Sequence, residues 1–207
     1  MGMIKGIRIM TPNAQLQRSL DQFNKPLNAA LGERDVYTQS HSARVVLIAE
    51  GLGRECGFSE SEIEVLRICA SFHDIGKIGI PDHILLKPAS FEEEEWTIMK
   101  SHPEIGERII RSIDVEGAEE VAQVVRHHHE HFDGGGYPDR LAGDAIPIYS
   151  RVLSIADSYD AMRTARSYHR ERTHAEVLEV LRSEAGGKHD PWLLDKFVGM
   201  PDPEEIS

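Results

Sequence analysis

The sequence predicts an all-α protein, on the evidence of its periodicity and its composition. Apolar residues recur at intervals of three and four positions in one segment after another, which is the spacing of one face of an α-helix. Aromatic residues make up only 6% of the chain, and runs of β-branched residues that could form strands are few. The 207 residues are enough for one domain with a proper core and an extension.

The first helical segment belongs to an N-terminal extension or linker, which we assign to residues 1–31. Thr11 and Pro12 have the character of an N-cap followed by proline at the first helical position. The apolar stripe consists of Leu16, Leu20, Phe23, Leu27 and Leu31. Pro26 interrupts it, so we expect a kink or two short helices, the second capped by Asn24. The stripe fits a helix packed on its own domain, or alternatively a dimerising or signal-connecting helix.

Two helices are predicted in the next segment. The first runs from Arg34 to Gly57, and its inward residues are Val45, Ile48, Ala49 and Leu52. Ser59 and Glu62 have the spacing of a capping box, which starts the second helix. That helix is expected to end near Gly76.

The following two helices also begin with recognisable signals. Ser90 and Glu93 form another predicted capping box. The acidic run Glu92–Glu95 lies in a first turn, where negative charge is favoured, so we interpret it as a solvated helix start and not a metal site. The chain restarts at His102 and Pro103, because proline is tolerated in a first helical turn.

A further helix is expected from Gly117 to His131. Its inner valine stripe, continued by three and four residues, reaches His128 and His129. The run HHHEH is also typical of a surface patch that scavenges metal ions. We prefer that interpretation for His127 and His131, and not for the two histidines on the inner stripe.

Residues 133–147 are dense in glycine and proline and are predicted to form a loop. Glycines 134–136 allow positive φ and close approach of the backbone to a ligand.

The helix that starts at Ile148 carries Asp157, whose burial is costly unless the carboxylate is paired or bound to a cation. Asp160 lies nearly one turn later and is expected to support a metal ligand.

Two more helices complete the prediction. One begins at the Thr173–Glu176 capping box and ends at Gly186–Gly187. The other runs from Asp190 through Phe197. Residues 201–207 are expected to form a frayed tail.

The charge and cysteine content narrow the class of protein. A net charge of −12 argues against binding to a nucleic-acid polymer, which needs clustered Lys and Arg. No apolar run approaches the ~20 residues needed to span a membrane, and the N-terminus lacks the apolar core of a signal peptide. Cys56 and Cys69 show no disulfide spacing and suggest buried free thiols in a reducing compartment. We therefore expect a cytoplasmic protein.

The strongest chemical signal is the stretch SFHDIGKIGIP at residues 71–81. The adjacent His73 and Asp74 are a poor core motif, because a buried charge needs a partner, but a good start for a metal site. Neighbouring residues on a helix point about 100° apart, so this pair cannot enclose a metal. The other candidate ligands are His41, His102, His128, His129 and Asp157.

Five motifs in order resemble the HD-GYP family of bacterial metal-dependent phosphodiesterases, a branch of the HD phosphohydrolases. They are RDVYTQSHSARV, HDIGKIGIP, KSHPEIG, HHEHFDGGGYP and ADSYDAM. The resemblance runs from about Gly32 to about Val198. It implies an HD-domain helical bundle with a GYP loop and extra C-terminal helices, which we assign to residues 32–200.

The resemblance also implies a binuclear metal centre. Its ligands would be His41, His73, Asp74, His102, His128, His129 and Asp157. Seven ligands are too many for one tetrahedral zinc and suit two octahedral divalent ions, which Asp74 can bridge. A set without thiolates favours iron or manganese and leaves nickel and zinc open. Tyr37 stands where some members have a glutamate ligand, so a third metal is less expected.

The implied reaction is hydrolysis of cyclic di-GMP to pGpG or GMP by a hydroxide that bridges the metals. Asp74 and Lys77 would be catalytic, and Lys77 would also contact a substrate phosphate. The other substrate-binding residues would be Gly136, Tyr137, Pro138 and Arg166. His169 stands where the family usually has a basic residue, which leaves part of the substrate clamp open.

Two alternative functions remain at this stage. The chain could hydrolyse another cyclic dinucleotide or nucleotide, or it could be a non-catalytic cyclic di-GMP receptor that signals through protein contacts. The expected protein partners are a second copy, bound through the N-terminal helix, and a diguanylate cyclase or another signalling protein.

Overall fold

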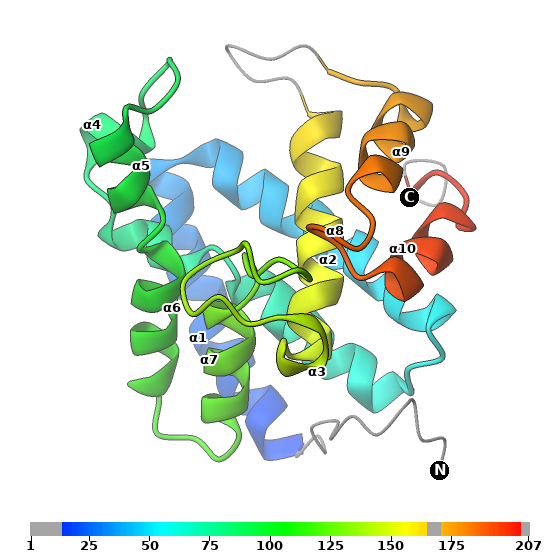
Figure 1. Ribbon diagram of the computed structural model, residues 1–207. Helices are drawn as coiled ribbons and strands as arrows, with labels where there is room; N and C mark the ends of the chain where they lie inside the picture. Colours follow the sequence, from blue (N-terminus) through cyan, green and yellow to red (C-terminus); the bar gives the residue numbers. More distant parts are fainter. Residues whose placement is uncertain (1–13, 165–170, 204–207) are drawn as a thin grey trace.

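The computed structural model describes residues 14–164 and 171–203 (Figure 1). Over these residues the chain is helical and forms no strand, which confirms the all-α prediction. The elements are α1 (Ala14–Arg34), α2 (Val36–Glu55), α3 (Glu60–Phe72), the 3-10 helix η1 (Ile75–Gly79), α4 (Asp82–Leu85), α5 (Glu93–Met99), α6 (His102–Arg111), α7 (Ala118–Arg126), the 3-10 helix η2 (Gly143–Ala145), α8 (Ile148–Arg163), α9 (His174–Ser183) and α10 (Pro191–Val198). None of these helices is long and apolar enough to cross a membrane.

The main core is built around α2. This helix packs against α1, α3 and α8, and α8 in turn contacts α9 and α10. In Figure 1, α8 crosses α2 near the middle of the molecule, with the α6–α7 pair on one side and α9 and α10 on the other. The inward residues predicted for α2 all lie in this core: Val45, Ile48, Ala49 and Leu52.

Helix α1 is continuous through Pro26, so the prediction that Asn24 caps a second short helix is wrong. Pro26 is exposed, and the helix is held on both sides of it by side-chain contacts to the end of α3. Asn24 donates to Ser71 Oγ at 2.9 Å, and Asn28 donates to the Ser71 carbonyl at 3.1 Å. The proposed cap at Thr11 and Pro12 lies outside the described residues.

The stripe on α1 is only partly buried. Leu20 and Leu31 belong to the main core, whereas Phe23 is 43% exposed. The helix therefore packs on its own domain through three of its leucines, because the partly buried Leu27 also packs against this core. The division of the chain at residue 31 stays a prediction.

Two of the predicted capping boxes are confirmed: Ser59–Glu62 and Thr173–Glu176. The box predicted at Ser90 and Glu93 is wrong, because the cap of α5 is Glu92. The Glu95 carboxylate accepts from the Glu92 N–H at 2.8 Å and from Lys87 Nζ at 2.5 Å. The lysine holds Glu95 in the position that closes the first turn, so the helix starts two residues later than predicted.

Two helices end earlier than predicted, α3 immediately before His73 and α7 two residues before His128. Helix α3 ends at Phe72 and not near Gly76, and α7 ends at Arg126, before the histidine run. The side chains of His73 and His128 each form a hydrogen bond with the carbonyl three residues earlier. Such carbonyls have no partner within the helix, so the imidazole satisfies them as the chain leaves the helix.

The C-terminal helices lie close to their predicted positions. Helix α9 ends at Ser183, before the expected glycine stop, and Gly186 then turns the chain with φ 78°. The Asp190 carboxylate caps α10 by accepting from the Trp192 N–H at 2.9 Å. The end of the predicted tail, residues 204–207, lies outside the described residues.

Residues 80–99, which include α4 and α5, form a small lobe with an apolar cluster of its own. Ile80, Ile84 and Met99 are buried in this cluster, and Phe91 packs against them. Arg34, at the end of α1, fastens the lobe by donating to the Ile80 carbonyl at 2.8 Å. The lobe is thus supported separately from the main core.

Replacement of Gly76 by alanine should destabilise the fold. Gly76 lies where η1 meets α6, and an added Cβ would be 1.8 Å from the His102 carbonyl oxygen and 2.6 Å from the Gly106 nitrogen. Both neighbours are backbone atoms, so overpacking should cost at least about 1–3 kcal/mol. The measurement is the midpoint of urea unfolding.

Gly199→Ala is the matched control. The backbone φ of Gly199 is −78°, and its added Cβ would meet nothing nearer than 3.5 Å. This variant should change stability by no more than about 0.5 kcal/mol. Equal midpoints for the two variants would contradict the close contact at Gly76.

Candidate metal centre

The seven side chains predicted as metal ligands converge on one region. His41, His73 and Asp74 form one cluster, in which one potential ligand atom from each residue lies within 4.8 Å of the others. A second cluster with the same property contains His102, His128 and His129. Asp157 joins the first, since its Oδ1 lies 3.0 Å from His41 Nε2. We call these sets the Asp74 group and the His102 group.

Three of the imidazoles are oriented by the ends of helices. Their Nδ1 atoms lie within hydrogen-bond distance of backbone carbonyls: His73 with Ala70 at 2.6 Å, His102 with Met99 at 2.8 Å and His128 with Val125 at 2.6 Å. A carbonyl oxygen can only accept, so each Nδ1 carries a hydrogen and each neutral ring presents a lone pair at Nε2. This is the arrangement in which histidine binds a metal.

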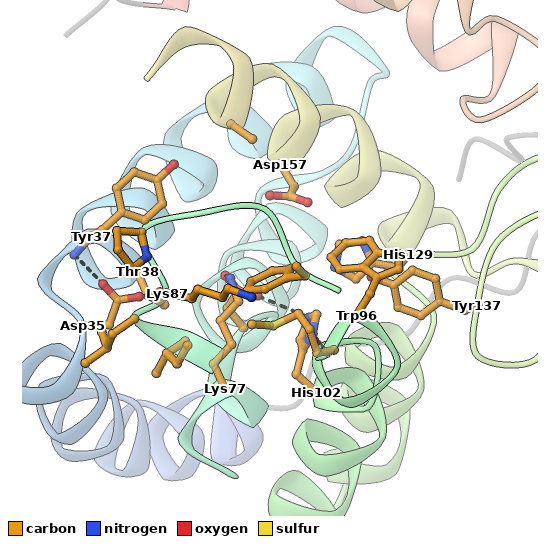
Figure 2. A pocket seen from close by; sticks show the side chains of 17 residues that line it. Asp35, Tyr37, Thr38, Lys77, Lys87, Trp96, His102, His129, Tyr137 and Asp157 are labelled. Atoms are coloured by element: carbon orange, nitrogen blue, oxygen red, sulfur yellow. Dashed lines mark hydrogen bonds and ion pairs between the residues drawn. The ribbon is translucent and has the colours of Figure 1, made fainter. Parts of the chain in front are cut away.

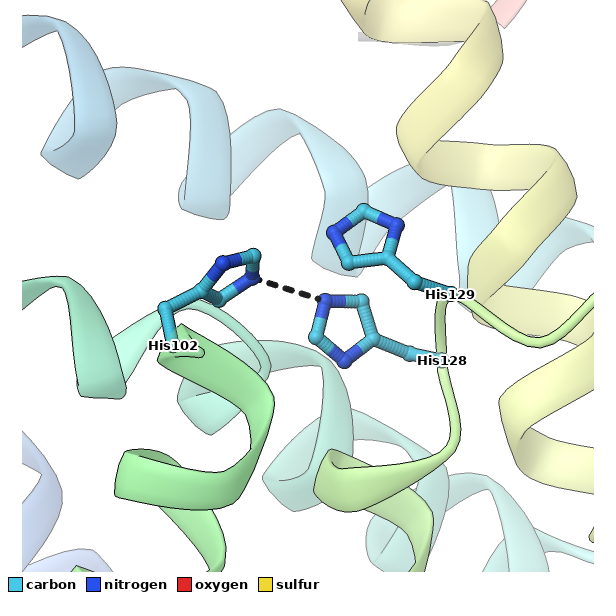
Figure 3. Close-up of side chains that lie close together, drawn as sticks. All are labelled: His102, His128 and His129. Atoms are coloured by element: carbon cyan, nitrogen blue, oxygen red, sulfur yellow. Dashed lines mark hydrogen bonds between the residues drawn. The ribbon is translucent and has the colours of Figure 1, made fainter. Parts of the chain in front are cut away.

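The lone pairs of the His102 group face one another. The Nε2 atoms of His102 and His128 lie 3.4 Å apart, and His129 lies beside them (Figure 3). His73 Nε2 is buried and has no hydrogen-bond partner among the described residues. Nitrogen lone pairs directed at one another in a buried region fit a cation between them.

His41 is oriented by a carboxylate and not by a carbonyl. Its Nδ1 lies 2.6 Å from Asp160 Oδ2, and Arg44 Nε donates to the other Asp160 oxygen at 2.6 Å. Burial opposes a positive charge on His41, but hydrogen bonds to Asp157 and Asp160 outweigh it and raise its pKa to about 9. Asp160 thus directs His41 Nε2 towards Asp157, as the expected supporting role requires.

Asp74 connects the two groups. Its Oδ1 lies 3.4 Å from His102 Nε2, while its Oδ2 lies 3.5 Å from His73 Nε2 and 2.5 Å from Lys77 Nζ. Burial opposes ionisation of this carboxyl, but Lys77 and the surrounding histidines outweigh burial and hold its pKa well below the usual range. An ionised carboxylate with one oxygen on each side can bridge two cations.

The three histidines of the His102 group and Asp157 are in the protonation states that metal binding needs. Burial lowers the pKa of His102 to about 4 and that of His128 to about 3, and it also lowers the pKa of His129. Burial of Asp157 opposes its charge, but the hydrogen bond from His41 and the surrounding histidines together outweigh burial and hold the Asp157 pKa well below its usual range. Neutral imidazoles and ionised carboxylates without a thiolate fit divalent transition-metal ions.

A third cluster contains His127, Glu130 and Asp139, and its two carboxylates are already satisfied by protein donors. Asp139 accepts two hydrogen bonds from Arg126 and lies 2.9 Å from His127 Nε2. Glu130 accepts from the backbone N–H groups of Asp139 and Leu141. His127 is only 6% exposed, so its assignment to a surface metal-scavenging patch is wrong. This cluster fastens the glycine-rich loop to the end of α7.

The loop brings Tyr137 to the centre. The Tyr137 ring stacks on His129 with centroids 4.9 Å apart, and it lines the adjoining cavity. Gly136 packs against the chain itself, since an added Cβ would be 2.2 Å from the His131 nitrogen. Neither Gly136 nor Pro138 is among the described residues that line the cavity. Two predicted positions, Arg166 and His169, lie outside the described residues.

The cavity beside the two groups has a volume of about 520 Å³, which is within the range of small-molecule sites. Figure 2 shows Lys77, His102, His129 and Asp157 around it. It also shows Lys87 and Trp96, which come from the small lobe and which the motifs did not single out. Nothing in the local sequence pattern around either residue indicated that the lobe reaches the ligands.

A comparison with known protein families identifies the family of this chain. Residues 27–193 match the HD domain family. The chain belongs to this family. The match covers every residue of the Asp74 and His102 groups. HD-domain phosphohydrolases use divalent metals, and the buried His and Asp clusters could bind such ions.

Curated relatives support the HD-GYP resemblance within the HD domain family. The cyclic di-GMP phosphodiesterase response regulator RpfG of Xanthomonas campestris is 37% identical over 83% of this chain and 46% of its own length. The 3'3'-cGAMP-specific phosphodiesterase 2 of Vibrio cholerae is 37% identical over 82% of this chain and 32% of its own length. The chain therefore spans less than half the length of these relatives.

Solved HD-domain structures share the fold. The cyclic GMP-AMP phosphodiesterase V-cGAP3 of V. cholerae superposes with a TM-score of 0.60 at 20% identity, over 89% of this chain and 47% of that one. The HD domain of the L. monocytogenes phosphodiesterase PgpH, solved with cyclic-di-AMP, gives a TM-score of 0.56 at 18% identity, over 83% of this chain and 91% of that one.

Replacement of Asp74 by alanine should abolish metal loading in both groups, because one carboxylate serves both. The measurement is the metal content of purified protein by mass spectrometry after anaerobic loading with Fe(II) or Mn(II). Asp144→Ala is the control, since the Asp144 side chain is 82% exposed and pairs only with Arg151 among the described residues. Full metal content in the Asp74 variant would show that the site is misassigned.

Proposed function

We propose that this chain is the catalytic domain of a metal-dependent phosphodiesterase that hydrolyses cyclic di-GMP to pGpG or GMP. The observation that carries the proposal is the ionised Asp74, which presents one oxygen to each of two histidine groups. Two relatives at 37% identity, from X. campestris and Thermotoga maritima, are named cyclic di-GMP phosphodiesterases. The substrate rests on these names, and the reaction type on the metal centre.

The seven side chains would hold two divalent cations, with iron or manganese preferred and nickel or zinc open. Such a pair, when bound, activates a water molecule and neutralises charge on the phosphoryl oxygens. The Tyr37 ring stacks on His41 with centroids 5.8 Å apart, at the position of the glutamate that some HD-GYP members use. That placement supports a two-metal centre over a three-metal one.

Lys77 would act on both the centre and the substrate. Its ammonium lies 2.5 Å from Asp74 Oδ2 and also lines the cavity. It favours the ionised form of Asp74 and places a positive charge where a phosphate would lie. Tyr137, on the glycine-rich loop, would also hold the substrate. We keep Gly136, Pro138 and Arg166 as proposed substrate contacts.

A second candidate is hydrolysis of cyclic GMP-AMP. The specific observation in its favour is that a relative named for that substrate is as similar to this chain as RpfG is. The two substrates share both phosphodiester bonds and differ in one base. The metal centre therefore serves either reaction, and the cavity wall decides between them.

Two further parts of the proposal concern the setting of the enzyme. The buried free thiols of Cys56 and Cys69 support a reducing compartment, and we propose the cytoplasm. Dimerisation through α1 and contact with a diguanylate cyclase or another signalling protein stay predictions.

Turnover can be tested directly. Protein loaded anaerobically with Fe(II), or in parallel with Mn(II), should convert cyclic di-GMP to pGpG or GMP on chromatography. Cyclic GMP-AMP in competition would rank the two candidate substrates. The Asp74→Ala protein should form no product, and absence of product from fully loaded wild-type protein would reject the proposed reaction.

Tyr137→Ala should weaken substrate binding and leave metal content intact. Loss of one stacking contact costs about 1–3 kcal/mol per base, so KM should rise roughly tenfold or more. Tyr137→Phe keeps the ring and should stay near the wild-type KM. Loss of metal from the alanine variant would show that the loop supports the ligands and not the substrate.

A further inference from the structure

The small lobe carries an exposed aromatic pair. Trp96, on α5, is 45% exposed, although it is one of the largest apolar side chains in the protein. Its ring stacks on Phe91, with centroids 5.8 Å apart and an angle of 20° between the planes. Stacked rings shield one face of each other, so such a pair can present a flat face to a ligand.

The aromatic pair is held in place by the apolar cluster of the lobe and by an ion pair in the first turn of α5. Phe91 packs on the buried cluster of the lobe, so apolar contacts fix the Phe91 ring. Glu95, the residue before Trp96, receives the Lys87 ammonium at 2.5 Å and closes the first turn of α5. Trp96 therefore projects from a braced helix and not from a loose loop.

The exposed pair opens into the same cavity as the metal ligands. Phe91, Trp96 and Lys87 line the cavity that also includes His102 and Asp157 (Figure 2). A ligand bound at the metal centre can thus reach the lobe without leaving the cavity. The lobe adds a flat aromatic surface to that wall, with the Lys87–Glu95 ion pair beside it. An aromatic surface of this kind is the feature on which a nucleobase stacks.

We propose that Trp96, supported by Phe91, is a stacking platform for a purine base of the substrate, with Lys87 beside it. The inference rests on the proposed function for its substrate and adds the residue that holds the base. It places substrate discrimination partly on the lobe, in addition to Tyr137 on the glycine-rich loop. A cyclic dinucleotide has two bases, and the cavity then offers two aromatic surfaces.

Kinetics provide the first test. Trp96→Ala should raise KM for cyclic di-GMP about tenfold with kcat within about twofold, because stacking holds the base and not the reacting phosphate. Trp96→Phe should recover most of the loss. Trp192, on α10 and outside the cavity lining, is the matched control: Trp192→Ala should leave KM unchanged. An unchanged KM in Trp96→Ala, or equal effects of the two alanine variants, would overturn the platform.

Fluorescence separates failure of the platform from failure of the proposed reaction. The chain has two tryptophans, so Trp192→Phe leaves only Trp96 to report. Metal-loaded Trp192→Phe protein should be quenched by GMP and not by ribose 5-phosphate, whereas Trp96→Phe protein should respond to neither. This result would support the platform even if no cyclic dinucleotide were hydrolysed. Equal responses to the two probes, or no response to GMP, would overturn it.

Discussion

The centre depends on hydrogen bonds between imidazoles and the last carbonyls of helices. His73, His102 and His128 each follow the end of a helix and bond back to the carbonyl three residues earlier. One interaction therefore satisfies an orphan carbonyl, ends the helix and fixes which nitrogen faces the cavity. The geometry of the candidate ligands is set by the same contacts that set the helix ends.

The buried carboxylates and histidines of the centre stabilise one another's charge states, so their burial is explained by the set and not by any single residue. Asp74 is held ionised by Lys77 and the histidines, while His102 and His128 are held neutral by burial. Asp160 on α8 and Arg44 on α2 extend this arrangement to His41. A buried network of this kind is costly when incomplete, and divalent cations complete it.

The sequence was sufficient for the fold class, most helices and the seven residues that converge, because these leave local signals in spacing and order. It was insufficient where a distant residue decides the outcome. Lys87 moved the start of α5, and side-chain contacts to Ser71 kept α1 continuous through Pro26. The helical phase selected His128 and His129, yet α7 ends before them. They face inward because of the turn and not because of the stripe.

The approach of Gly76 to the backbone of α6 separates two kinds of sequence change in this protein. There the turn after Asp74 rests directly on the carbonyl of His102, with no side chain between them. A contact between peptide groups has no rotamers and cannot be repacked by exchanging one apolar residue for another. The spacing between the segments that carry Asp74 and His102 is therefore insensitive to substitutions in the apolar core, while the lobe, with its separate cluster, can change in sequence without altering that spacing.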